Sequence, residues 1–336
     1  MTSLPISSDQ DLPTASDVLQ TFLFEASQVR GEIVRLENSW QVIQSRREYP
    51  LVIKRHLGEM VAAGVLLSAT LKFDGTLIIQ AQGSGLVQLL VVECTATMGI
   101  RATIKLSPGF DAAELSDKTT LADLINPDGQ GKLVITLDPT ARGEGQQAYQ
   151  GIVPLVIDGR PVETIAEAIM VYMKHSEQLE TRLWLASNEH FASGVLLQKI
   201  PSLGGKKSKD HLPPEELDDA WVRLQFLTDT VKNDELLNTP PARLMTRLFE
   251  TETEFQKVLT FPERIIKFSC QCSRHRVGDM LLMLGADEVE SILNELGHVE
   301  TICEFCGLGY LFDTVDCKQL FATKNAIEAK PQIGKH

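Results

Sequence analysis

Apolar positions in the first part of the chain follow two different periods. Residues 51–71, which follow Pro50, are apolar on almost every side, and this is typical of a long buried helix that begins after a proline. Two apolar, β-branched runs, 77–82 and 86–93, flank Gly83-Ser84-Gly85, and this arrangement predicts a β-hairpin. The pattern therefore combines a fully apolar helix with antiparallel strands.

Shorter apolar runs predict further strands. These runs lie at 32–36, 100–104, 132–137, 149–156, 182–186 and 195–200. Residues 161–179 instead place apolar side chains at helical spacing, with Val162, Ile165 and Ile169 on one face. Because hairpins outnumber helices and regular βαβ units are missing, an α+β fold is favoured. We expect an N-terminal α+β core domain of sheet and helix over residues 15–200.

The character of the sequence changes after the core. Gly204-Gly205-Lys206-Lys207 indicates a linker, and charged side chains are dense from there to residue 260. An apolar stripe still recurs at near-heptad spacing, at Leu217, Trp221, Leu224 and Val231. A second helical stretch begins at Pro240. Helices with so thin a stripe are marginal alone and need a partner surface, so we predict a charged helical linker over 201–260.

Four of the six cysteines lie in two close pairs near the end of the chain. Cys270 and Cys272 form a C-x-C pair, and Cys303 and Cys306 form a C-x-x-C pair. Two short thiol pairs that fold toward each other are a typical ligand set for a tetrahedral zinc site. The spacing therefore predicts that these four cysteines bind one Zn²⁺.

The residues between the two pairs are predicted to form two helices that bring the pairs together. Apolar side chains recur at helical spacing in 277–284 and in 289–293, and a glycine follows each stretch. We expect a small zinc-binding domain over 261–321. Residues 322–336 are predicted to be a flexible tail.

The cysteine pattern leaves more than one chemistry open. Four buried free thiols and a purely structural zinc site are the simpler alternatives. A redox switch is also open, because sulfurs around zinc lie roughly 3.7 Å apart whereas a disulfide joins them at about 2.05 Å. One pair cannot do both, so oxidation would expel the zinc. The small domain would then lose on the order of 10–16 kcal/mol of binding and folding free energy.

Four other side chains were candidates for roles in this chemistry. Cys94 lies in an apolar strand and is expected to be a packed thiol. Cys317 is interpreted in the same way, with an accessory redox role as the alternative. His275 and His298 are close to the cysteines, but four thiolates already complete a tetrahedron.

Composition narrows the class of protein further. The chain has 45 acidic and 32 basic residues, for a net charge of −13, which disfavours sequence-independent binding to nucleic acid. Its most apolar run, 60–71, is shorter than the ~20 residues that span a bilayer, and 1–11 lacks the features of a secretory signal. We expect a cytoplasmic protein that binds no membrane. No catalytic constellation emerges, so an enzyme is not predicted.

Several segments besides the cysteines match the pattern of a known family. They are 268–274, 288–293, 303–306 with Tyr310, Phe312 and Asp313, and, in the first region, 58–59, 71–75, 80–83, 129–131 with Thr136 and Asp138, 149–151 and 176–179. On these residues, over roughly 17–321, the chain resembles the heat shock protein 33 family of redox-regulated molecular chaperones.

The resemblance implies an ATP-independent holdase that binds unfolding client proteins under oxidative stress. In reducing conditions the four cysteines would bind zinc and the chaperone would be inactive. Oxidation would join Cys270 to Cys272 and Cys303 to Cys306, release the zinc, and unfold the zinc domain and the linker. The resemblance also implies a homodimer in the oxidised state.

Two other classes of function remain as alternatives. One is an interaction or nucleic-acid-binding protein with a constitutive zinc ribbon, whose binding oxidation would abolish. The other is an enzyme with a structural zinc and a catalytic cleft somewhere in 15–200. Of the three, the redox switch alone predicts that peroxide reversibly unfolds residues 206–321.

Overall fold

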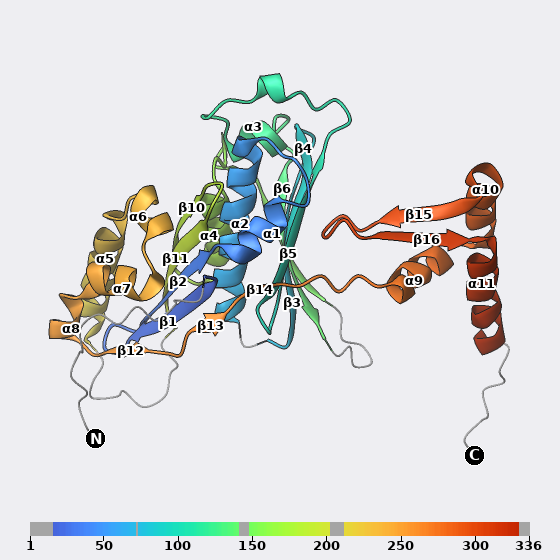
Figure 1. Ribbon diagram of the computed structural model, residues 1–336. Coiled ribbons are helices and arrows are strands. Elements are labelled where there is room, and N and C mark those ends of the chain that lie inside the picture. Colours follow the sequence, from blue (N-terminus) through green and yellow to red (C-terminus); the bar gives the residue numbers. More distant parts are fainter. Residues whose placement is uncertain (1–15, 72, 141–147, 202–211, 329–336) are drawn as a thin grey trace, which may run out of the picture. The chain divides into compact units, whose positions relative to one another are not determined.

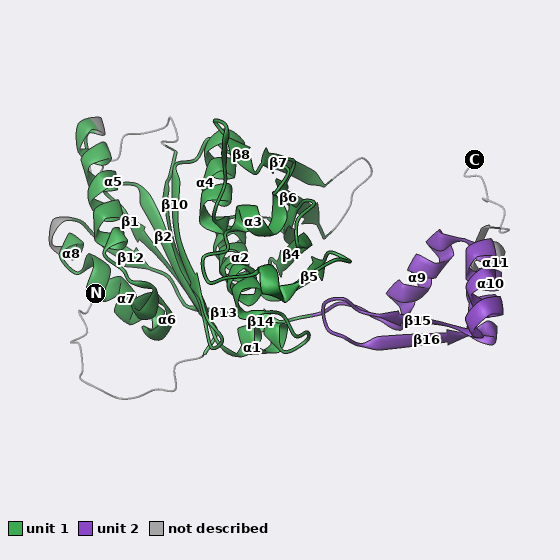
Figure 2. Cartoon of the chain, turned by 90° about the horizontal axis from the view of Figure 1, so that it is seen from above, with its two compact units in different colours: residues 1–269 green, residues 270–336 purple. Residues whose placement is uncertain are grey.

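The chain forms two compact units, residues 1–269 and residues 270–336 (Figure 2). The computed structural model describes residues 16–71, 73–140, 148–201 and 212–328 (Figure 1). The N-terminal segment 1–11 and the glycine- and lysine-rich segment 204–207, both used in the sequence analysis, lie outside these residues.

The first sheet of unit 1 is built from segments far apart in the sequence. Its strand order is β10-β11-β2-β1-β12, and β13 also pairs with β1. The strands are β1 (Val18–Phe24), β2 (Val29–Leu36), β10 (Thr181–Ser187), β11 (Ala192–Lys199), β12 (Val258–Thr260) and β13 (Arg264–Ile265). All of these pairings are antiparallel. The chain thus completes this sheet with the last residues of the predicted linker, in β12, and with β13, which follows the linker.

The second sheet of unit 1 contains the predicted hairpin. Its order is β14-β5-β4-β3-β6-β7, antiparallel except for the parallel pair of β14 and β5. The strands are β3 (Gly75–Gln82), β4 (Val87–Thr95), β5 (Gly99–Leu106), β6 (Lys132–Pro139), β7 (Tyr149–Pro154) and β14 (Lys267–Phe268). A two-stranded pair, β8 (Val156–Ile157) and β9 (Arg160–Pro161), follows β7. The hairpin prediction for 77–93 is confirmed by β3 and β4.

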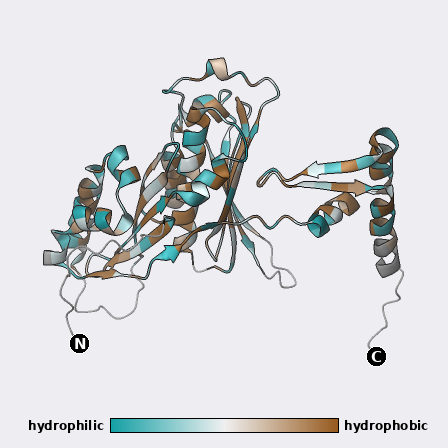
Figure 3. Ribbon diagram, viewed as in Figure 1, coloured by the Kyte–Doolittle hydropathy of each residue, from teal (hydrophilic) through white to brown (hydrophobic). Residues whose placement is uncertain are grey.

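A buried helix, α2 (Leu51–Thr70), lies between the two sheets (Figure 1). Its largely apolar surface, which appears brown over part of the helix in Figure 3, is explained by contacts with both sheets. The smaller helices of the unit are α1 (Asn38–Gln44), a 3₁₀ turn (Ala112–Glu114), α3 (Leu121–Ile125) and α4 (Ile165–His175). Helix α4 is shorter than the predicted 161–179, because the Thr164 side chain caps it by accepting the Glu167 N–H at 3.1 Å.

The helices of the predicted linker cover the outer face of the first sheet (Figure 1). They are α5 (Pro214–Asp229), α6 (Asn233–Asn238), α7 (Pro241–Phe249) and α8 (Glu252–Phe255). Trp221 and Leu224 of the apolar stripe are buried there against sheet residues. The ring of Phe249 lies 5.4 Å from that of Phe22 and 5.1 Å from that of Phe24. The partner surface that the thin stripe requires is therefore this sheet.

Unit 2 folds around a small core of its own. Its elements are α9 (Arg274–Leu284), α10 (Ala286–Leu296), β15 (His298–Ile302), β16 (Gly309–Asp313) and α11 (Thr314–Glu328). The two helices predicted between the cysteine pairs are α9 and α10. Gly285 and Gly297 end them at φ angles of 101° and 76°, which favour glycine.

The boundaries of the last segments differ from the expected ones. The zinc-binding domain was expected from residue 261, but β13 and β14 pair with strands of unit 1, whose last residue is Ser269. Strands β13 and β14 have only two residues each, so the alternation of apolar and polar side chains that marks a strand cannot be recognised there in the sequence. Helix α11 extends to Glu328, within the expected tail, while 329–336 lie outside the described residues.

The α+β fold class with a C-terminal four-cysteine cluster is confirmed. No helix among the described residues is long and apolar enough to cross a lipid bilayer.

The close packing of α2 on β10 gives a first prediction. A Cβ atom on Gly58 would lie 1.9 Å from Ser187 Oγ and 2.6 Å from Ser187 Cβ. We expect Gly58→Ala to lower the stability of unit 1 by about 1–3 kcal/mol through overpacking, seen as a lower midpoint in thermal unfolding followed by circular dichroism. Adding Ser187→Gly should restore much of the loss. A Gly58→Ala midpoint equal to that of the wild type would contradict the packing described.

Candidate metal centre

The structure brings together all four cysteines that the spacing had singled out. The Sγ atoms of Cys270, Cys272, Cys303 and Cys306 all lie within 4.8 Å of one another. The Sγ atoms of Cys270 and Cys303 are 3.7 Å apart, and those of Cys272 and Cys306 are 3.2 Å apart. All four cysteines are half-buried, and none is recorded in a disulfide. Both of these sulfur–sulfur contacts join one motif to the other.

The first pair is positioned by the start of helix α9. Cys270 and Cys272 lie between the last strand of unit 1 and this helix. Ser273 caps the helix, because its Oγ accepts the Arg276 N–H at 3.2 Å. The cap fixes where the helix begins, and so fixes Cys272 directly before its first turn.

The second pair is held by the tight turn between β15 and β16. The Cys303 N–H donates to the Leu308 carbonyl at 2.9 Å, and the Gly307 N–H donates to the Cys303 carbonyl at 2.8 Å. Gly307 has a φ of 72°, a conformation that residues with a Cβ rarely adopt. These bonds fold the C-x-x-C segment back on itself, so that Cys303 and Cys306 both reach the cluster.

A further residue, Arg274, ties the two cysteine-bearing segments together. Its guanidinium donates to the Leu311 carbonyl at 2.6 Å and to Asp316 Oδ2 at 2.6 Å, and lies 4.1 Å from the centre of the Phe312 ring. Asp313 Oδ1 in turn accepts the Asp316 N–H at 2.8 Å at the start of α11. The sequence analysis did not identify this role, since an arginine beside a cysteine motif has no distinctive pattern.

The cluster is electrostatically suited to a cation. Burial, reinforced by the neighbouring thiols, raises the pKa of Cys306 to about 12. Burial also raises the pKa of Cys303, and backbone N–H groups from Cys306 and Phe305 partly oppose this effect. At neutral pH the thiolate forms of Cys303 and Cys306 are therefore unfavourable unless a positive ion is bound, and metal binding would release protons. Zinc fits the residues present, since Zn–S distances of about 2.3 Å place tetrahedral sulfurs roughly 3.7 Å apart.

The other candidate side chains lie outside the cluster. His275 is 87% exposed and its Nε2 is 3.7 Å from Asp279 Oδ2, and neither it nor His298 belongs to the cysteine group. Cys94 is fully buried in β4 of unit 1, where burial raises its pKa to about 11. Cys317 is buried in the core of unit 2. The burial of both cysteines agrees with their interpretation as packed thiols.

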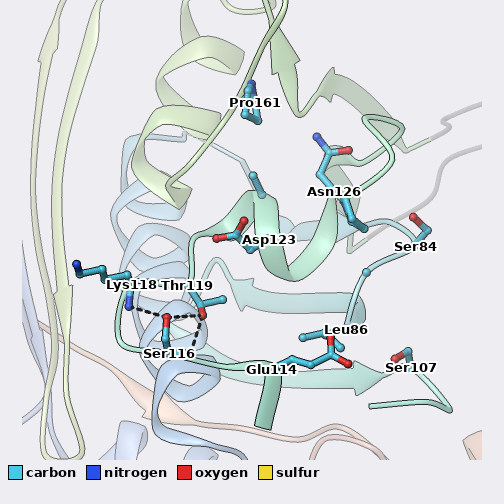
Figure 4. A pocket seen from close by; sticks show the side chains of 13 residues that line it. Ser84, Leu86, Ser107, Glu114, Ser116, Lys118, Thr119, Asp123, Asn126 and Pro161 are labelled. Carbon is cyan, nitrogen blue, oxygen red and sulfur yellow. Dashed lines mark hydrogen bonds between the residues drawn. The ribbon is translucent and has the colours of Figure 1, made fainter. Parts of the chain in front are cut away.

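Unit 1 contains a wide cavity of about 940 Å³ beside α3 (Figure 4). Its lining is about half polar, and several of the polar groups are used for local structure. Asp123 Oδ2 accepts both the N–H and the hydroxyl of Thr120 at 2.8 Å, and Thr119 Oγ1 accepts the Ser116 N–H at 2.9 Å. Local structure therefore accounts for several of the polar groups that line this cavity.

Comparison with known proteins gives a consistent result over nearly the whole chain. A family model described as Hsp33 protein matches residues 17–313. A protein named 33 kDa chaperonin from Methylobacillus flagellatus is 44% identical over 311 residues, covering 92% of this chain and 96% of that protein. A protein of the same name from Chromobacterium violaceum is 41% identical over 305 residues, covering 91% of this chain and 94% of that protein.

A solved structure supports the fold. The crystal structure of the 33 kDa chaperonin, a heat shock protein 33 homologue, from Thermotoga maritima aligns with a TM-score of 0.69 and 19% identity. The alignment covers 93% of this chain and 99% of that chain.

The geometry of the cluster predicts which cysteines bind metal. Replacing any one of Cys270, Cys272, Cys303 or Cys306 by serine should reduce bound zinc from about one ion per chain to near zero, because three thiolates leave the tetrahedron incomplete. Cys94→Ser and Cys317→Ser are the matched controls and should keep their zinc. Mass spectrometry of the metal in purified protein measures this, and a cluster variant that retains a full equivalent of zinc would contradict the assignment.

Arg274 should slow the loss of metal. Arg274→Ala removes a stacking contact and two charge-assisted hydrogen bonds, so we expect zinc to transfer to a chelator at least about tenfold faster under reducing conditions. Arg276→Ala is the control, since Arg276 bonds Gln271 Oε1 at 3.1 Å within its own segment. Equal transfer rates in the two variants would show that Arg274 does not hold the site together.

Proposed function

The chain belongs to the Hsp33 family, and we propose that it is a redox-regulated, ATP-independent holdase that prevents aggregation of unfolding proteins under oxidative stress. The observation that carries the proposal is the convergence of four cysteine thiols within 4.8 Å in a small separate unit. Such a site can be either a metal centre or a source of disulfides, but it cannot be both at once.

In the reduced state the four cysteines would hold one Zn²⁺ as thiolates. The ion would supply on the order of 10–16 kcal/mol of free energy that is also folding free energy. Unit 2 depends on this contribution, because its own fully buried core is small: Leu281, Val289, Val299, Tyr310, Phe312 and Cys317. The reduced protein is therefore the folded and inactive form.

Oxidation would convert the same cysteines into two disulfides, Cys270–Cys272 and Cys303–Cys306. Each disulfide would form when two thiolates give up two electrons to one molecule of hydrogen peroxide, which takes up two protons from the solvent and is reduced to two molecules of water. The two bonds consume all four ligands, so the ion leaves and unit 2 loses the free energy that kept it folded.

The proposed pairing implies that the cluster opens while the bonds form. In the folded cluster two sulfur–sulfur contacts, of 3.7 Å and 3.2 Å, join the C-x-C motif to the C-x-x-C motif. Once unit 2 loosens, pairing within a motif closes a far shorter loop than pairing between motifs, and costs less entropy. Local unfolding would therefore direct oxidation toward the pairing within motifs, and mild heat, which loosens unit 2, should accelerate activation.

The surface that would bind clients lies beneath the linker helices. Phe22, Phe24 and Ile33 on the outer face of the first sheet are buried under α5, α6 and α7. Unfolding of the linker would uncover this face together with the apolar stripe of the helices. Contiguous exposed apolar surface binds other proteins, and unfolding clients are the partners that the proposal assigns to it.

The proposal also includes the oligomeric state, the cellular location and the partners of the protein. Two oxidised chains can bury part of it against each other, so we assign a homodimer to the oxidised state. A cytoplasmic location is proposed, because a reducing compartment keeps the thiols available for metal. The acidic chain is not proposed to bind nucleic acid, nor is membrane binding assigned to it.

Light scattering of a heat-unfolding client, without ATP, tests the proposal. Zinc-loaded reduced protein should leave aggregation unchanged, and protein treated with peroxide at mildly elevated temperature should suppress it. Dithiothreitol with added zinc should reverse the effect. Cys317→Ser should switch as the wild type does, because Cys317 is not assigned to either disulfide. Two inert forms would indicate that the cysteines are only a structural site, and equal activity of both forms would exclude redox control.

A further inference from the structure

Both ends of the linker segment meet at the turn between β1 and β2. At its start, the Leu212 N–H donates to the Ala26 carbonyl at 3.1 Å. At its end, Gln256 Oε1 accepts the Ser27 N–H at 3.1 Å. One short turn of the sheet therefore anchors the helices from both sides.

A bidentate ion pair joins the first helix of the linker to the last. Arg223 of α5 donates from Nε to Glu252 Oε1 at 2.6 Å and from Nη2 to Glu252 Oε2 at 3.0 Å. Gln256 Nε2 also donates to Glu252 Oε2, at 3.1 Å. With the bond from Ser27, these contacts form a continuous chain from α5 through α8 to the sheet. We call these four residues the linker latch.

The two charges of the latch are in different environments. The Glu252 side chain is 1% exposed, whereas that of Arg223 is 45% exposed. Arg223 borders a cavity of about 410 Å³ that is also lined by Glu216 and Asp219. If the pair separates while α8 stays in place, Arg223 meets water and other carboxylates, but Glu252 remains a buried charge without its cation. Such a charge is strongly unfavourable, so α5 and α8 should open together.

A second ion pair in the linker provides a comparison. Arg247 of α7 and Glu235 of α6 are joined at 2.7 Å, and their side chains are 43% and 25% exposed. This pair connects neighbouring helices of the linker, and its carboxylate is within reach of water. It matches the latch in chemistry but not in burial or in position.

We propose that the linker latch, and the Arg223–Glu252 pair in particular, keeps α5–α8 closed on the first sheet and sets how readily the linker opens. The inference rests on the proposed function, to which it adds the residues that hold the linker helices closed. The latch lies wholly in unit 1 and contains no cysteine, so its contacts do not themselves change with the oxidation state of the cysteines.

The test uses full-length, reduced and zinc-loaded protein. Arg223→Ala leaves Glu252 buried and unpaired, so hydrogen exchange of amides in 214–255 should accelerate about 100-fold or more. This variant should suppress client aggregation without oxidant while it keeps its zinc. Glu252→Gln should have a smaller effect, since the cation left behind is half-exposed. Glu235→Gln is the matched control and should exchange and behave like the wild type.

A double variant separates the latch from general destabilisation. Arg223→Met with Glu252→Met replaces the pair by apolar side chains of similar length, which is often neutral for stability. It should restore slow exchange and inactivity in the reduced protein. Wild-type exchange in Arg223→Ala, or a double variant that opens as readily as Arg223→Ala, would overturn the proposal. Failure of oxidised wild-type protein to protect clients would instead overturn the proposed function, while the exchange data would still decide the latch.

Discussion

The first sheet is apolar on both faces, and much of the structure follows from the need to cover it. Leu19 and Val34 pack inward with helix α2, whereas Phe22 and Ile33 pack outward against the linker helices. A sheet that buries both faces needs a cover on each, because exposed apolar strands associate with other chains. The inner cover is a permanently buried helix, and the outer one is a set of short helices rich in charge.

The two covers differ in burial, and this difference explains how the linker helices can detach while the core of unit 1 stays folded. Helix α2 is buried along most of its length, so it cannot leave without loss of the whole core. The linker helices are exposed on their charged sides, and α6 and α8 are only six and four residues long. Short helices have little stability of their own and depend on packing. Opening them can therefore be a local event, with a free energy well below that of global unfolding.

The sequence predicted those elements whose pattern is local. The helix at 51–71, the hairpin at 77–93 and the two helices between the cysteine pairs have clear apolar patterns and clear ends, and all of them are present. The convergence of the four cysteines could be predicted because metal binding restricts both the type and the spacing of ligands. The surface beneath the linker helices could not, since it is formed by strands far apart in sequence. Likewise, nothing distinguishes Arg223 and Glu252 from the many solvated charges around them until the fold buries one of them.

The order of strands in the first sheet also has a consequence for synthesis of the protein. The hairpin of β1 and β2 is made first, but β2 pairs on its other side with β11, which begins at Ala192. At a translation rate of about 5–20 residues per second, on the order of 10–30 s pass between the two strands. The helices that cover the outer face emerge later still. A nascent chain of this protein is thus an open apolar hairpin for much of its time on the ribosome, and its own folding is slowed by long-range pairing.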